Sequence, residues 1–241
     1  MTKKRSIFPN FITMSNMIMG FLAIIFANRG DMNSLAIAGI LVFAGSFFDL
    51  ADGALARALD VESPIGVELD SLADAVTYGI APGIIAYNFY LYKLPEICCS
   101  VNLGMIIALL FPICAVYRLA RFNVADKQNG FSGLPSPAAG IMISSVPCLA
   151  TAELPILGDA GFTMPVEYYI PMYVVTAILM VSRVDYNKLF SDIAKKGKIT
   201  VVVAVILIAL LLYFFRMWSV FTATAIYISC GIVKYIVRFN K

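Results

Sequence analysis

Four aspartates lie close together in the segment 49–74, which reads DLADGALARALDVESPIGVELDSLAD. Asp49 and Asp52 are three residues apart and Asp70 and Asp74 are four apart, so on helices each pair shares one face. Four converging carboxylates need added positive charge to stay ionised, and hard divalent cations prefer oxygen ligands. The segment therefore predicts one or two Mg²⁺ or Mn²⁺ ions that hold a diphosphate.

The remaining composition restricts the chemistry to carboxylates. The chain contains no histidine, which is the commonest general base and a common zinc ligand. Its five cysteines lack the spacing of a metal site, and we expect them to pack as small apolar residues. No Ser, Cys or His constellation indicates a covalent intermediate.

The residues between the aspartates predict how the two helices meet. Asp60 to Pro64 form a short polar turn, and helices joined by a short turn are antiparallel neighbours. The two polar faces can then converge, with Arg57 offsetting part of the negative charge. Gly53, Ala56 and Gly66 are small, which allows a helix backbone or a flat ligand to approach closely.

The elements that carry these residues are predicted to cross a membrane. Of the 241 residues 61% are hydrophobic and only 14% are charged, with a mean hydropathy of +0.86. Soluble domains are far less apolar. Eight stretches approach the length of about 20 apolar residues that a bilayer requires, near 10–28, 34–57, 67–92, 101–122, 135–152, 166–183, 199–215 and 218–237. We expect an all-α integral membrane protein, a bundle of about eight transmembrane helices forming one domain over residues 1–241.

The basic residues predict the orientation of this bundle. With eight spans both termini share one side, and of the 18 basic residues only Arg29, Lys93 and Arg216 lie on the other. The positive-inside rule therefore places both termini in the cytoplasm. Asp49 lies toward the cytoplasmic end of its helix, so we expect an active site that faces the cytoplasm from the plasma membrane. The lysine-rich connection 184–198 is expected to anchor on anionic lipid headgroups.

The order of residues in the acidic segment resembles the signature of the CDP-alcohol phosphotransferases at every defining position, Asp49-x2-Asp52-Gly53-x2-Ala56-Arg57-x8-Gly66-x3-Asp70-x3-Asp74. The resemblance implies that the four aspartates ligate metal, with Asp74 also acting as the catalytic base. It further implies that Gly53, Ala56, Arg57 and Gly66 hold the nucleotide and its diphosphate.

Two further segments extend the resemblance. Pro9-Asn10-x2-Thr13-x2-Asn16 resembles the N-terminal element of the family, which implies that Asn10 and Thr13 line the nucleotide site. The alternative is an ordinary asparagine N-cap. The runs 118–123 (RLARFN) and 131–137 (FSGLPSP) resemble the phosphatidylserine synthase branch of the family.

This branch implies a serine acceptor bound by Arg118, Arg121 and Asn123. An arginine fork suits a carboxylate, which serine carries, but also a phosphate. The alternative for both arginines is a purely anchoring role at the end of a membrane helix. The resemblance also implies a homodimer, and nothing in the sequence indicates a nucleic-acid partner.

The expected reaction is transfer of the phosphatidyl group of CDP-diacylglycerol, or the archaetidyl group of CDP-archaeol, to L-serine with release of CMP. One alternative keeps this chemistry and replaces serine with glycerol 3-phosphate or inositol phosphate. A membrane transporter is the alternative from a different class, since transporters also carry aspartates in their helices. It would place the carboxylates nearer the middle of the bilayer than the sequence does.

Overall fold

The computed structural model describes residues 7–59, 63–124, 133–151, 161–184, 186 and 198–239, and within them the protein is almost entirely helical. The helices are α1 (Ile7–Ala27), α2 (Met32–Leu59), α3 (Pro64–Asp74), the π-helix η2 (Ala75–Ile80), α4 (Ala81–Phe89), the 3-10 turn η3 (Leu91–Lys93), α5 (Leu103–Val124), α6 (Ser136–Ala150), α7 (Val166–Val181) and α9 (Lys198–Phe239). Two short strands, β1 (Glu96–Cys98) and β2 (Val101–Asn102), complete the list.

All eight predicted apolar stretches are helical over most of their length. Four helical segments in the described residues are long and apolar enough to cross a membrane, namely Asn10–Ala27, Met32–Leu55, Leu103–Val124 and Arg216–Val237. The apolar helices α6 and α7 are shorter. The chain is thus a helical membrane protein, whereas the count of eight spans and the side of the termini stay predictions.

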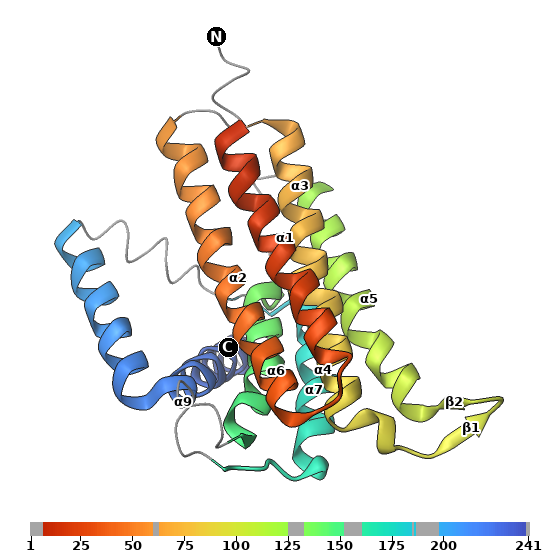
Figure 1. Ribbon diagram of the computed structural model, residues 1–241. Helices are drawn as coiled ribbons and strands as arrows, with labels where there is room; N and C mark the ends of the chain where they lie inside the picture. The colour runs from red at the N-terminus through yellow and green to blue at the C-terminus, as the bar shows by residue number, and fades with distance from the viewer. Residues whose placement is uncertain are drawn as a thin grey trace.

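The long helices run side by side and alternate in direction. Figure 1 shows α1, α2, the α3–α4 segment and α5 aligned, with the start of α1, the end of α2, the start of α3 and the end of α5 at one end of the bundle. The last two predicted spans form the two halves of α9, which point in different directions (Figure 1) because Arg216 leaves the helical conformation at φ 49°. Because α2 ends and α3 begins at the same end of the bundle, the aspartates of both helices lie at that end.

Side-chain caps define where α2 and α3 begin. The backbone N–H of Ser34 donates to Asp31 Oδ2 at 2.8 Å, and this hydrogen bond holds the pKa of Asp31 below its usual value. At the start of α3, the N–H of Gly66 donates to Ser63 Oγ at 3.1 Å, with Pro64 in the first turn. Both patterns are typical helix starts, and the second sets the register of Asp70 and Asp74.

A π-helical turn separates α3 from α4 immediately after Asp74. Pro82 has no N–H to continue the hydrogen-bond ladder, and its ring would clash with the carbonyl four residues earlier in an α-helix. The chain widens instead, and the N–H of Ala81 donates to the carbonyl of Val76, five residues back. Such turns often occur at functional sites, and here the turn follows directly on the acidic segment.

The hairpin β1–β2 departs from the all-helical expectation. Glu96 pairs with Asn102 and Cys98 with Val101, and the turn residues Cys99 and Ser100 have φ values of 48° and 66°. Two positive φ angles in a two-residue loop match the twist of a tight hairpin. The strands are too short for a periodic pattern, so the sequence predicted only a connection here.

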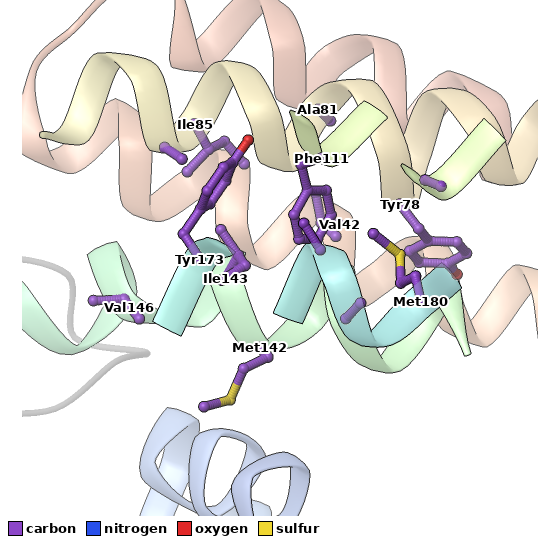
Figure 2. Close-up of a cluster of buried hydrophobic side chains, with 14 of the residues drawn as sticks. Val42, Tyr78, Ala81, Ile85, Phe111, Met142, Ile143, Val146, Tyr173 and Met180 are labelled. Atoms are coloured by element: carbon purple, nitrogen blue, oxygen red, sulfur yellow. The ribbon is translucent and has the colours of Figure 1, made fainter. Parts of the chain in front are cut away.

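Tyrosines and aliphatic side chains fill the centre of the bundle. Figure 2 shows the buried side chains of Ile85, Phe111 and Tyr173 packed between the helices. Small residues let the helices approach closely. A Cβ at Gly39 of α2 would lie only 2.1 Å from the carbonyl oxygen of Ser144 in α6, so a larger residue would separate these helices.

Candidate active site

Three of the four predicted aspartates form one cluster. Asp49 of α2 and Asp70 and Asp74 of α3 each offer a carboxylate oxygen, and these three oxygens lie within 4.8 Å of one another. The carboxylates converge as the sequence predicts, but the expectation that α2 and α3 are direct neighbours is wrong, because the two helices barely touch and α1 packs against both of them.

This cluster fits a divalent cation. Asp49 is repelled by the charge of Asp70, and both are repelled by the charge of Asp52. Asp70 Oδ1 is buried and has no hydrogen-bond partner among the described residues. A cation would offset the repulsion and satisfy the buried oxygen. The donors are all carboxylate oxygens, which Mg²⁺ and Mn²⁺ accept.

Asp52 lies beside the cluster and not within the group of three. Its side chain is buried and interacts electrostatically with both Asp49 and Asp70. The spacing of three residues places Asp52 on the face of Asp49, one turn nearer the end of α2. The sequence predicted all four aspartates as metal ligands, and the structure places Asp52 outside the group whose oxygens lie within 4.8 Å of one another.

Asn16 of α1 forms a hydrogen bond with Asp74. Its side-chain Nδ2 donates to Asp74 Oδ1 at 3.3 Å, and its backbone carbonyl accepts a hydrogen bond from Thr77 Oγ1 at 3.0 Å. Asn16 is completely buried. Asn16 belongs to the N-terminal element that resembles the family, although only Asn10 and Thr13 of that element were predicted to line the site. The three-residue steps from Asn10 through Thr13 to Asn16, which share one helix face, were the available signal.

The predicted nucleotide residues are partly brought together. A Cβ on Gly66 would lie 3.4 Å from Asn10 Oδ1, so the start of α1 meets the start of α3. Thr13 is buried on α1, and Gly53 is half-buried on α2. Ala56 and Arg57 belong to the final turns of α2 by their backbone, and their side chains lie outside the described part of the structure.

Arg118 places a buried positive charge next to the aspartates. Its Nη1 donates to Ser136 Oγ at 2.7 Å, and both side chains are buried. Its guanidinium also interacts electrostatically with Asp74 and Asp49, and with Tyr227 of α9. Arg118 thus connects α5 and α6 to the acidic cluster. Ser136 lay in the sequence run that resembles the serine branch, but no role was assigned to it.

Arg121 and Asn123 make different contacts from Arg118. Arg121 Nη1 donates to the carbonyl of Val181, the last residue of α7, at 3.0 Å. Basic side chains commonly satisfy the last carbonyls of a helix in this way. Asn123 Nδ2 donates to Ser71 Oγ at 3.0 Å and joins the end of α5 to α3. These contacts hold helices together, and the role of both residues in acceptor binding stays a prediction.

The bundle and its partly buried carboxylate cluster define a helical membrane protein with an acidic site that could hold a divalent cation. Residues 6–170 match the CDP-alcohol phosphatidyltransferase family, and the chain belongs to this family. Its members generally depend on divalent metal ions, which agrees with the cluster of Asp49, Asp70 and Asp74.

Relatives named CDP-diacylglycerol–serine O-phosphatidyltransferase occur in bacteria and archaea. The Bacillus subtilis protein is 38% identical over 156 residues, covering 64% of this chain and 83% of that protein. The Helicobacter pylori protein (strain 26695) is 29% identical over 243 residues, covering 98% and 95%. The Methanocaldococcus jannaschii protein is 30% identical over 234 residues, covering 94% and 93%.

Proposed function

We propose that this enzyme transfers the phosphatidyl group of CDP-diacylglycerol, or the archaetidyl group of CDP-archaeol, to the hydroxyl of L-serine and releases CMP, with Mg²⁺ or Mn²⁺ bound by the aspartates. The observation that carries the choice of serine is the buried Arg118 beside Asp74 and Asp49. An arginine fork in this place can bind the carboxylate of the acceptor while its hydroxyl lies next to Asp74. The names of the relatives support the same acceptor.

In the proposed reaction the serine hydroxyl oxygen attacks the phosphorus that bears the lipid. Asp74 accepts the hydroxyl proton, and Asn16 holds this carboxylate in place through its 3.3 Å hydrogen bond. The phosphorus–oxygen bond to the CMP phosphate breaks, and CMP leaves with the bonding electrons. Cations held by Asp49, Asp70 and Asp74, with Asp52 beside them, would neutralise the negative charge of the diphosphate, and positioning would supply the rest of the catalysis.

The proposed enzyme has its site at the cytoplasmic face of the membrane, consists of one domain and forms a homodimer. The distribution of basic residues supports a site that opens to the cytoplasm at the plasma membrane. The family match ends at residue 170, but α9 packs against α6, which supports a single domain over 1–241. The family resemblance supports a homodimer.

Product analysis tests the acceptor directly. Purified protein receives a CDP-lipid, Mn²⁺ or Mg²⁺, and labelled L-serine, with glycerol 3-phosphate and inositol phosphate in parallel reactions. We expect metal-dependent labelled aminophospholipid and an equal amount of CMP from serine alone. CMP release only with a phosphorylated alcohol would keep the phosphotransfer and reject serine. No turnover with any acceptor would reject the enzymatic proposal.

Replacing Arg118 is expected to impair serine use selectively. In Arg118→Lys the charge remains but the two-pronged donor is lost, so we expect kcat/KM for serine to fall about 10- to 100-fold, mostly through KM. The KM for the CDP-lipid should change less than threefold. Arg29→Gln, which removes an exposed arginine stacked on Phe26, is the control. An unchanged serine KM in Arg118→Lys would contradict the assignment.

A further inference from the structure

Tyr78 carries a buried hydroxyl that the proposed reaction does not use. Its side chain is completely inaccessible to solvent, and its hydroxyl has no hydrogen-bond partner among the described residues. Buried polar groups in proteins nearly always have a partner, so an isolated hydroxyl needs a reason. The ring packs in the central core next to Met180 (Figure 2), and this apolar environment offers the hydroxyl no hydrogen bond.

The position of Tyr78 in the chain directs this hydroxyl toward the carboxylates. It lies four residues beyond Asp74 in η2, and side chains on a helix lean toward its N-terminal end. The phenol therefore leans back over the turn that carries Asp74. Its oxygen interacts electrostatically with all four aspartates, most strongly with Asp49.

Close packing keeps the ring in this position. A Cβ on Gly140 of α6 would lie 3.0 Å from Tyr78 Cα, so α6 presses directly on the backbone of the π-helical turn. Thr77, the preceding residue, is fully buried against α1 through its hydrogen bond to Asn16. With α6 and α1 packed against it on both flanks, the turn that carries Tyr78 has little room to move.

We propose that Tyr78 is a positioning residue of the cation site: its hydroxyl, unpartnered in this structure, donates a hydrogen bond to the Asp49 carboxylate when that carboxylate turns to bind a cation. Carboxylates that ligate metal are commonly held by such a second hydrogen bond, and its loss weakens metal binding. The inference rests on the proposed cation site of Asp49, Asp70 and Asp74. It assigns a purpose to a hydroxyl that core packing alone does not require.

The test measures metal affinity in the full-length protein and compares two tyrosines. Tyr78→Phe removes the hydroxyl in question. Tyr169→Phe is a matched control, since Tyr169 is also fully buried with an unpartnered hydroxyl, but it packs among Phe89 and Tyr90 in the aromatic part of the core. Titration with Mn²⁺ in the presence of CDP, followed by the electron paramagnetic resonance signal of the free ion, gives the Kd.

We expect the Kd for Mn²⁺ to rise about 10- to 100-fold in Tyr78→Phe and to stay within twofold of the unmodified protein in Tyr169→Phe. Without metal, both variants should melt at the same or a higher temperature than the unmodified protein, because each loses an unpaired buried hydroxyl. This combination separates positioning of the metal site from a general effect on the core.

Two outcomes would overturn only the role of Tyr78. These are unchanged Mn²⁺ affinity in Tyr78→Phe, and an equal loss of affinity in Tyr169→Phe, which would indicate an effect of core packing. A third outcome, no Mn²⁺ binding by the unmodified protein, would reject the cation site and with it the role of Tyr78. The failure of the inference is therefore distinguishable from the failure of the proposed function.

Discussion

Asp74→Asn is expected to lower turnover by roughly 10²- to 10⁴-fold while the protein stays folded. Asparagine has the shape of aspartate but cannot accept the proton of the acceptor hydroxyl. Asn16 Nδ2 can still donate to the oxygen of the new side chain, as it does to Asp74 Oδ1. The measurement is CMP release at saturating CDP-lipid, serine and metal, combined with a melting curve.

Asp31→Asn is the matched control for this variant. It makes the same chemical change on an exposed carboxylate at the start of α2, where asparagine is an equally good helix cap. We expect its turnover to remain within twofold of the unmodified protein. Near-normal turnover in Asp74→Asn would show that another group takes the proton, and Asp70, the other aspartate of α3 in the cluster, would be the next candidate.

Asp49→Asn is expected to weaken metal binding by about 100-fold or more. Loss of a hydrogen bond to a metal ligand already lowers metal affinity about 10- to 100-fold. Loss of the charge of a ligand should therefore lower the affinity by about 100-fold or more. Turnover at low Mn²⁺ should fall in parallel. The rise in melting temperature that Mn²⁺ gives the unmodified protein should disappear, because a ligand stabilises in proportion to its occupancy.

The same substitution should not destabilise the protein without metal. Asp49 interacts unfavourably with the neighbouring charges of Asp70 and Asp52, so its neutralisation relieves repulsion. Glu68→Gln removes an exposed carboxylate from α3 and is the control, with unchanged Mn²⁺ affinity expected. If Asp49→Asn bound Mn²⁺ as tightly as the unmodified protein, the cluster would not be the metal site.

The acidic segment shows which features of the site can be predicted from residue spacing alone. Steps of three and four residues, a short turn and a proline-started second helix suffice to predict that Asp49, Asp70 and Asp74 converge, because each of these features acts within one or two helical turns. The same holds for the apolar stretches, whose length and composition made them helices. Asp60 to Glu62 of the predicted turn lie outside the described residues.

Other parts of the site depend on contacts between residues distant in the chain. Arg118 meets Ser136 from another helix, and Asn16 meets Asp74 across 58 positions. No local pattern records which face of α1 or α5 turns toward α3, since that depends on how all the helices pack together. The same argument applies to Arg121, whose bond to the end of α7 follows from the placement of that helix.

The sequence by itself determined the class of fold and the acidic motif. Because the chain has no histidine, it also limited the acid–base and metal chemistry to carboxylates. The tertiary structure decided that Asp52 stands outside the group of three and that the buried Arg118 interacts electrostatically with Asp74 and Asp49. It also decided that the hydroxyl of Tyr78 is buried without a hydrogen-bond partner among the described residues. The physical reason is the range of the interactions. Helix formation depends on neighbours within a few residues, whereas burial and electrostatic pairing depend on helices that only packing brings together.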